Sequence, residues 1–142
     1  ALCMVGGLTL GLAGTTYYDN VMSLFTLSGL AIVVTNREAM ATGTLLRGTM
    51  IALIAGLVTG LAVGLKLPQG IFAIGFAASL AAVRGDWKHR TTRLLAGGLG
   101  GIVSVALMSG YWWLLMYHVT GNPLFPYFNQ YFHSPLALTA SY

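Results

Sequence analysis

The sequence predicts an all-α protein, a polytopic bundle of about five transmembrane helices that forms one domain over residues 1–142. Hydrophobic residues make up 56% of the chain and charged residues only 7%, whereas a soluble domain carries about 25% charged residues. Most of the apolar runs also lack a polar face, so lipid is the solvent that suits them. The 19 glycines favour the same structure, because small residues let membrane helices approach closely.

Five apolar runs define the expected helices. They cover about residues 1–16, 20–35, 49–65, 67–83 and 94–118. A hydrocarbon core of ~30 Å requires about 20 residues of helix, so the fourth run either includes flanking residues or crosses incompletely. The first run begins without a methionine, and the last stretch ends at Tyr142 without a polar tail. We therefore expect a fragment of a longer protein.

The basic residues predict the orientation of these helices. Six of the seven fall between runs two and three or between runs four and five: Arg37, Arg47, Arg84, Lys88, Arg90 and Arg93. By the positive-inside rule both connections are cytoplasmic. The loop before residue 20, the turn at Lys66 and an aromatic tail over residues 119–142 then lie on the outer side. The basic residues are scattered and form no stripe, so we expect no nucleic-acid partner.

Asp19 is the acidic residue at the outer start of the second run, and it allows two interpretations. In the first, Asp19 or the neighbouring Asn20 caps the helix by accepting hydrogen bonds from first-turn amides, where the helix dipole favours a negative charge. In the second, the carboxylate acts as a general base or binds a divalent cation at the membrane surface. A single carboxylate does not decide between a structural and a chemical role.

Lys66 and the tail supply the other candidate site residues. Lys66 follows a glycine-rich run, where its ammonium group either extends to the lipid headgroups or binds a lipid-linked phosphate. In the tail, Pro123 and its neighbours end the preceding helix. Aromatic rings there alternate with amides, which suits an amphipathic surface or a sugar-binding ledge. The candidates for substrate binding in the tail are Asn122, Tyr127 and Asn129.

Two other motifs favour structural roles. The glycines of residues 97–101 follow no strand, so they predict a close helix-packing face and not a nucleotide-binding loop. His118 and His133 lack the spacing of a zinc site, and we assign no metal ligand to the histidines. A divalent cation at Asp19 remains an open alternative, and no other cofactor is indicated.

Three segments resemble bacterial multi-spanning glycosyltransferases of the C fold class. These segments are YYDNVMSLFTLSGLAIVV, GLAVGLKLPQG and TGNPLFPYFNQYFHSP, in the order in which they occur along the chain. The resemblance implies a multi-pass protein of the bacterial inner membrane. It also implies transfer of a sugar from a polyprenyl-phosphate carrier on the outer face, with Asp19 matching the acidic position, Lys66 the basic position and Asn122 the polar loop residue.

The chain also departs from the family pattern. The acidic loop expected near the first helix is absent, and so is a C-terminal soluble domain. The alternative hypothesis is therefore a non-enzymatic accessory subunit that packs through its glycine-rich faces against other membrane subunits. A transporter or channel is disfavoured, because no ionisable residue lies in the middle of a predicted helix.

Overall fold

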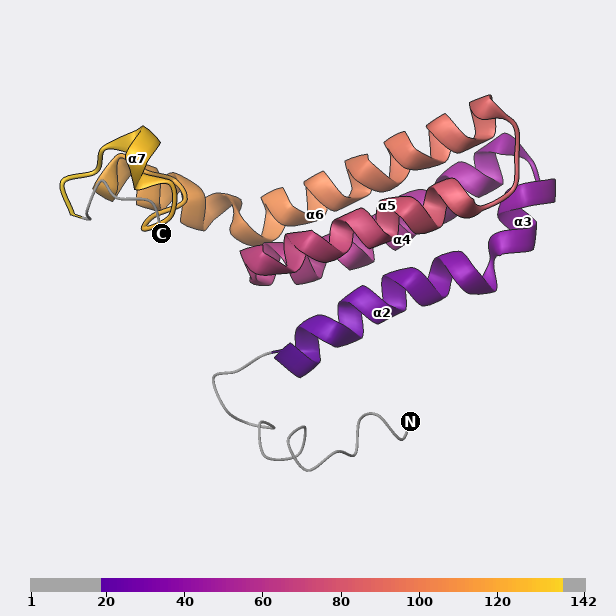
Figure 1. Cartoon of the computed structure of the whole chain (residues 1–142), viewed down its shortest axis with the longest axis horizontal. Coiled ribbons are helices and arrows are strands. Elements are labelled where there is room, and N and C mark those ends of the chain that lie inside the picture. The colour runs from indigo at the N-terminus through magenta and orange to yellow at the C-terminus, as the bar shows by residue number, and fades with distance from the viewer. Residues whose placement is uncertain (1–18, 137–142) are drawn as a thin grey trace. The chain divides into compact units, whose positions relative to one another are not determined.

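The computed structural model describes residues 19–136, and all of the regular structure in this range is helical (Figure 1). The elements are α2 (Asp19–Thr35), α3 (Arg37–Thr42), α4 (Leu45–Leu65), the 3₁₀ helix η2 (Leu67–Gly70), α5 (Ile71–Ala82), α6 (Trp87–Thr120) and α7 (Asn129–Phe132). The predicted all-α class is confirmed for this part of the chain. The predicted run over residues 1–16 lies outside the described residues.

The chain divides into two compact units, one up to Val105 and one from Ala106. The first unit contains α2 to α5 and the beginning of α6. The second contains the rest of α6, the turns that follow it and α7. Each unit is described by itself below.

Helices of the first unit alternate in direction along the chain (Figure 1). The connection from α2 through α3 to α4 and the loop between α5 and α6 therefore lie at one end of this unit. We call this the basic end, and define it as residues 36–47 and 83–93. The start of α2 and the turn from α4 into η2 lie at the opposite end. This arrangement matches the alternation that the basic residues predicted.

Glycines allow α4 and α6 to touch backbone to backbone. A Cβ atom added at Gly60 would lie 2.5 Å from the Gly101 carbonyl oxygen, and one added at Gly56 would overlap the Gly97 carbonyl. Such separations are too short for any side chain, so only glycine permits the contact. The predicted helix-packing face is confirmed for Gly97, Gly100 and Gly101, whereas a Cβ atom at Gly98 would meet nothing within 4 Å.

Two of the described helices, α4 and α6, are long and apolar enough to span a membrane. The shorter apolar stretches Asn20–Thr35 and Leu67–Ala82 accompany them. At 1.5 Å per residue the 17 residues of α2 measure about 25 Å and the 12 residues of α5 about 18 Å. Both values are below the ~30 Å of a hydrocarbon core. A five-span bundle is therefore not confirmed by the described residues, in which two helices are long enough to cross.

Two predicted helix boundaries were wrong, and capping explains both. The run expected to begin at residue 49 begins at Leu45, because the Thr44 side chain accepts a hydrogen bond from the Arg47 amide at 3.3 Å. The run expected to begin at residue 94 begins at Trp87, where Asp86 provides a cap. Polar residues in a first turn are compatible with a helix when a cap satisfies its free amides, although they interrupt the hydropathy pattern.

Candidate functional site

Lys66 lies where α4 changes into η2, at the end of the first unit opposite the basic end. Its backbone amide donates to the Ala62 carbonyl at 3.0 Å, and its carbonyl accepts from the Gln69 amide at 2.9 Å. Pro68 stands in the first turn of η2, where a missing amide hydrogen costs little. The turn is thus fixed through the backbone, and the half-buried side chain of Lys66 takes no part in either of these two bonds.

Asp19 is the first residue of α2, and its backbone lies at the same end of the first unit as Lys66 (Figure 1). Asn20 also falls in the first turn of this helix. A carboxylate in a first helical turn is favoured by the helix dipole. The orientation of the Asp19 side chain lies outside what the structure describes, so both interpretations of this residue remain predictions.

In the second unit, two asparagines hold the tail after α6 in a fixed conformation. Asn122 accepts from the Leu124 amide at 2.9 Å and donates to the Tyr127 carbonyl at 2.9 Å. Asn129 makes the same pair of bonds with the amide and the carbonyl of Ser134, at 2.8 and 3.0 Å. Each side chain thus closes a short turn of backbone with a pair of hydrogen bonds, which we call an asparagine bracket.

These bonds argue against Asn122 and Asn129 as substrate ligands. Asn122 is 0% exposed and Asn129 is 1% exposed, so their amides face the protein and shape the loop. Tyr127, in contrast, is 51% exposed. Of the three tail residues that the sequence singled out, the structure presents only Tyr127 to a ligand.

Three further aromatic rings that follow Tyr127 in the sequence are exposed. These are Phe128, Tyr131 and Phe132. Phe128 has a φ of 56° and His133 a φ of 53°, in the left-handed region that non-glycine residues seldom adopt. These two residues flank α7, so the backbone adopts unfavourable conformations at both ends of this short helix. Such conformations persist only where surrounding bonds impose them, and the Asn129 bracket is one such bond pair.

Arg93 was expected in the loop between the fourth and fifth runs, and the loop assignment was wrong. It lies inside α6 and is 1% exposed. Its guanidinium group donates to the Met40 carbonyl at 3.0 Å, to the Val83 carbonyl at 3.0 Å and to the Arg84 carbonyl at 3.2 Å. Arg93 therefore joins α6 to the C-terminal ends of α3 and α5, where the helix dipoles favour a cation. No local pattern in the sequence distinguishes Arg93 from the exposed basic residues around it.

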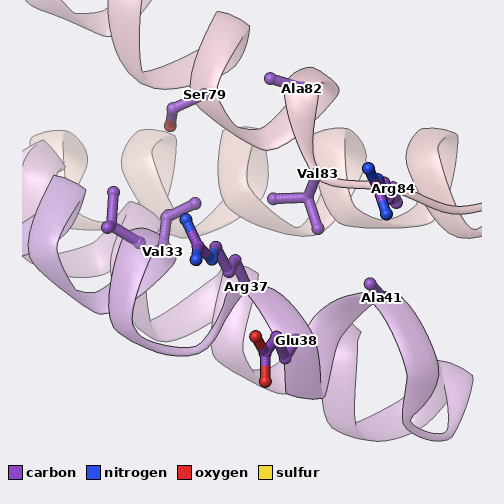
Figure 2. Close-up of a pocket in the computed structure, with 9 residues that line it drawn as sticks. Val33, Arg37, Glu38, Ala41, Ser79, Ala82, Val83 and Arg84 are labelled. Carbon is purple, nitrogen blue, oxygen red and sulfur yellow. The ribbon is translucent and has the colours of Figure 1, made fainter.

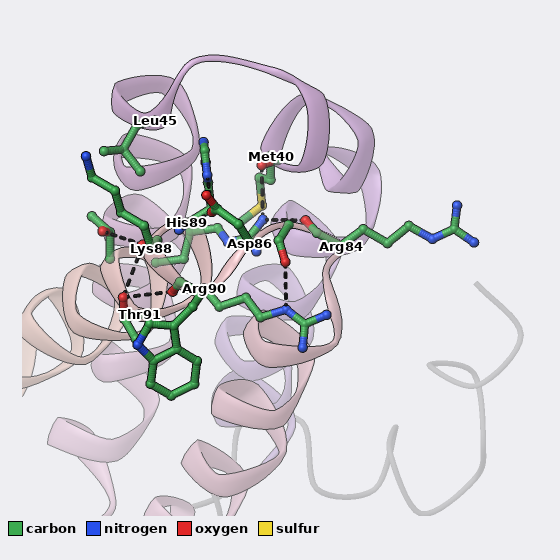
Figure 3. A network of polar contacts seen from close by, with 12 residues as sticks. Met40, Leu45, Arg84, Asp86, Lys88, His89, Arg90 and Thr91 are labelled. Carbon is green, nitrogen blue, oxygen red and sulfur yellow. Dashed lines mark hydrogen bonds and ion pairs between the residues drawn. The ribbon is translucent and has the colours of Figure 1, made fainter.

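Asp86 is the cap that starts α6. Its side chain accepts from the His89 amide at 2.9 Å and contacts the His89 ring nitrogen Nδ1 at 2.5 Å (Figure 3). The hydrogen bond from the His89 amide, followed by that from the ring, lowers the pKa of Asp86 below its usual value. The carboxylate thus stays ionised at neutral pH and satisfies a free amide of the first turn.

Replacing Asp86 with alanine is expected to fray the first turn of α6. The amides of His89 and Arg90 should then exchange hydrogen with solvent several-fold faster, as measured by hydrogen–deuterium exchange, whereas Asp86→Asn should retain most of the protection because it keeps an acceptor oxygen. Because the native pKa is lowered, the stabilisation is complete above the ordinary aspartate pKa of about 3.9. It is lost as the pH falls through the lowered native pKa. Unchanged exchange in Asp86→Ala would show that the cap is not needed.

Metal ligands do not gather in the part of the chain that is described. Within residues 19–136, no three His, Cys, Asp or Glu side chains lie close enough together to hold a metal ion. Among the candidate residues, Tyr127 is exposed and Lys66 is half-buried. Comparison of the chain with protein-family models, with curated proteins and with solved structures finds no match.

Proposed function

We propose that this chain is the membrane-embedded part of a multi-pass glycosyltransferase that takes a sugar from a polyprenyl-phosphate carrier at the outer face of the bacterial inner membrane. The observation that carries the proposal is the placement of Asp19 and Lys66. Asp19 is the first residue of α2, and Lys66 directly follows the last residue of α4. Both positions lie at the end of the first unit opposite the basic end. A carboxylate and an ammonium at one membrane face suit deprotonation of an acceptor and binding of a lipid phosphate.

Exposed apolar side chains support the membrane location. Leu27 is 63% exposed, Ile74 is 72% exposed and Leu95 is 74% exposed, on three different helices of the first unit. Large apolar patches of this kind indicate contact with lipid or with a partner. The basic end then faces the cytoplasm by the positive-inside rule, which leaves Asp19 and Lys66 on the outer side.

The aromatic tail supports sugar binding on that same side. If α6 crosses the membrane from its basic N-terminus, the tail after Thr120 emerges on the outer face. Within the second unit, Tyr127 and Tyr131 are exposed on a backbone fixed by the two asparagine brackets. Rings that are held in place lose little conformational entropy when a ligand stacks on them. The role of Asn122 and Asn129 in this proposal is to position the rings.

The alternative of a non-enzymatic accessory subunit stays a prediction, since it rests on the incomplete catalytic set and the short chain. In that hypothesis the glycine-rich faces pack against other chains. Gly56, Gly60, Gly97 and Gly100 instead meet neighbouring helices inside the first unit. These four glycines are therefore occupied within the chain, whereas Gly98 has nothing within 4 Å of an added Cβ atom. Packing against other membrane subunits through different surfaces stays a prediction.

The proposal is tested with the chain reconstituted in phospholipid vesicles and supplied with a polyprenyl-phosphate hexose radiolabelled in the sugar, together with a mixture of lipid and polysaccharide acceptors that carry free hydroxyl groups. In the transfer an acceptor oxygen replaces the phosphate oxygen at the anomeric carbon. Formation of labelled glycoside and release of polyprenyl phosphate should both depend on the protein. Asp19→Asn, which keeps the size of the side chain and removes its basicity, should lower the rate about a hundredfold. Lys66→Met should raise the KM for the carrier more than it lowers kcat, since it removes a binding charge. Tyr127→Ala should also weaken sugar binding.

The matched control is Arg47→Gln, which removes a charge at the basic end and should leave transfer unchanged. Equal rates for Asp19→Asn and the parent protein would overturn the assignment of Asp19 as the base. The absence of any carrier turnover would overturn the proposed function. The membrane location fails separately if the protein is monodisperse in buffer without detergent.

A further inference from the structure

The seam between α2 and α5 is open at the basic end of the first unit. A hollow of about 570 Å³ lies there between the two helices (Figure 2). Val33 and Val34 line it from α2, and Ala82 and Val83 line it from the end of α5. Its size is that of an ordinary ligand site, and most of its wall is apolar.

Two arginines from different segments stand at this hollow. Arg37 comes from the start of α3 and Arg84 from the loop after α5, and both are exposed. Figure 2 shows them on the two opposing sides of the hollow. The carboxylate of Glu38 also lines it, which leaves one net positive charge among these three side chains. The hollow therefore combines an apolar wall with a cationic mouth.

A second hollow, of about 300 Å³, continues along the same seam. Thr26 and Leu30 line it from α2, and Phe72 and Phe76 line it from α5. Leu30 lies about one helical turn from Val33, so the two hollows follow one another along the helices. From Val34 back to Ser23, the seam measures about 16 Å at 1.5 Å per residue. This length matches one leaflet, which is half of the ~30 Å hydrocarbon core.

We propose that the α2–α5 seam binds one anionic phospholipid of the cytoplasmic leaflet. Its phosphate lies between Arg37 and Arg84, and one acyl chain extends along the apolar seam toward Ser23. The apolar wall selects a lipid over free phosphate, and the two guanidinium groups select an anionic headgroup over a zwitterionic one. The inference depends on the membrane location proposed above but not on sugar transfer, since the seam's mouth lies at the end opposite Asp19 and Lys66.

The test is native mass spectrometry of the whole chain in detergent, titrated with palmitoyl-oleoyl phosphatidylglycerol. Phosphatidylcholine with the same acyl chains serves as the zwitterionic probe and inorganic phosphate as the probe without a chain. We expect one phosphatidylglycerol to bind about tenfold more tightly than phosphatidylcholine. The double variant Arg37→Gln/Arg84→Gln should abolish this preference. Ala82→Phe, which fills the hollow and keeps both charges, should weaken binding of both lipids.

The matched control is Arg47→Gln/Lys88→Gln, which removes the same charge from the basic end at residues that do not line the hollow. Its preference for phosphatidylglycerol should stay within about twofold of the parent value. An equal loss in both double variants would overturn the proposal in favour of general charge attraction. Inorganic phosphate that displaces the lipid stoichiometrically, or unchanged lipid binding in Ala82→Phe, would overturn the assignment of the seam as an acyl-chain site.

A segment of this chain is the competing occupant, and the single cysteine allows it to be detected. Cys3 belongs to the apolar run over residues 1–16. In the variant Ser79→Cys, oxidation would join Cys3 to the introduced thiol if that run filled the seam. Rapid and complete disulfide formation together with no lipid binding would overturn the proposal. Saturable binding of one phosphatidylglycerol that slows the disulfide reaction supports it.

Discussion

Replacing Arg93 with methionine is expected to lower the free energy of unfolding of the first unit by about 3–5 kcal/mol. Methionine has a similar length but cannot donate hydrogen bonds. The carbonyl groups of Met40, Val83 and Arg84 would each lose a charged donor. Hydrogen bonds to charged groups contribute about 1.5–3 kcal/mol each, and the cost of burying the guanidinium offsets part of their sum. Steric trapping of the unfolded state in one detergent measures the change.

Two further variants separate the role of the hydrogen bonds from that of the charge. Arg93→Lys keeps the charge, but a single ammonium does not reproduce the planar fork of the guanidinium, so we expect about half of the loss. Arg90→Gln is the exposed control. The Arg90 side chain donates from Nε to the Gly85 carbonyl at 3.1 Å, and loss of this bond should cost less than about 1 kcal/mol. A stability of Arg93→Met equal to that of the parent would contradict the role of Arg93 as the link between the three helices.

Replacing Gly100 with alanine is expected to separate α4 from α6. An added Cβ atom would overlap the carbonyl oxygen of Leu53 and lie 2.9 Å from the Leu57 amide nitrogen. Both atoms belong to the α4 backbone, so no side-chain rotation relieves the overlap. Overpacking costs about 1–3 kcal/mol, and we expect a loss of about 3 kcal/mol because the obstacle is rigid. Unfolding in detergent measures the loss, and spin labels on α4 and α6 measure the increase in their separation.

Gly98, two residues away on the same helix, provides the control. A Cβ atom at this position would meet nothing within 4 Å. Gly98→Ala should therefore stabilise the helix by about 0.5–1 kcal/mol, the usual difference in helix propensity. The opposite signs expected for Gly98 and Gly100 cannot arise from propensity alone. Equal effects of the two substitutions would contradict the close contact between α4 and α6.

The candidate site was predictable in part. Lys66 and Asp19 were found because each interrupts the hydropathy pattern at the end of an apolar run, and the structure places their backbones at one end of the first unit. Asn122 and Asn129 were recognised as polar residues in an aromatic tail. Their burial was not foreseen, because an amide that brackets a turn and an amide that faces a ligand have the same local sequence.

The sequence predicted some helix boundaries to within a few residues. Other boundaries differ more from the prediction. The end of α4 at Leu65 agrees with the predicted run, since Lys66 and Pro68 follow immediately. The start of α6 lies seven residues before the predicted one. Hydropathy places the boundary where apolar residues begin, whereas the helix begins where Asp86 can satisfy a free amide.

The sequence by itself determined the all-α class, the apolar runs and the segregation of charge between the two ends of the first unit. These properties depend on composition and on neighbours along the chain, because each helix satisfies its own backbone hydrogen bonds. Only the tertiary structure decided that Arg93 is a buried link and that Gly100 lies against α4. Arg93 and Met40 are 53 residues apart, and hydropathy carries no information about which distant carbonyl groups a side chain will reach.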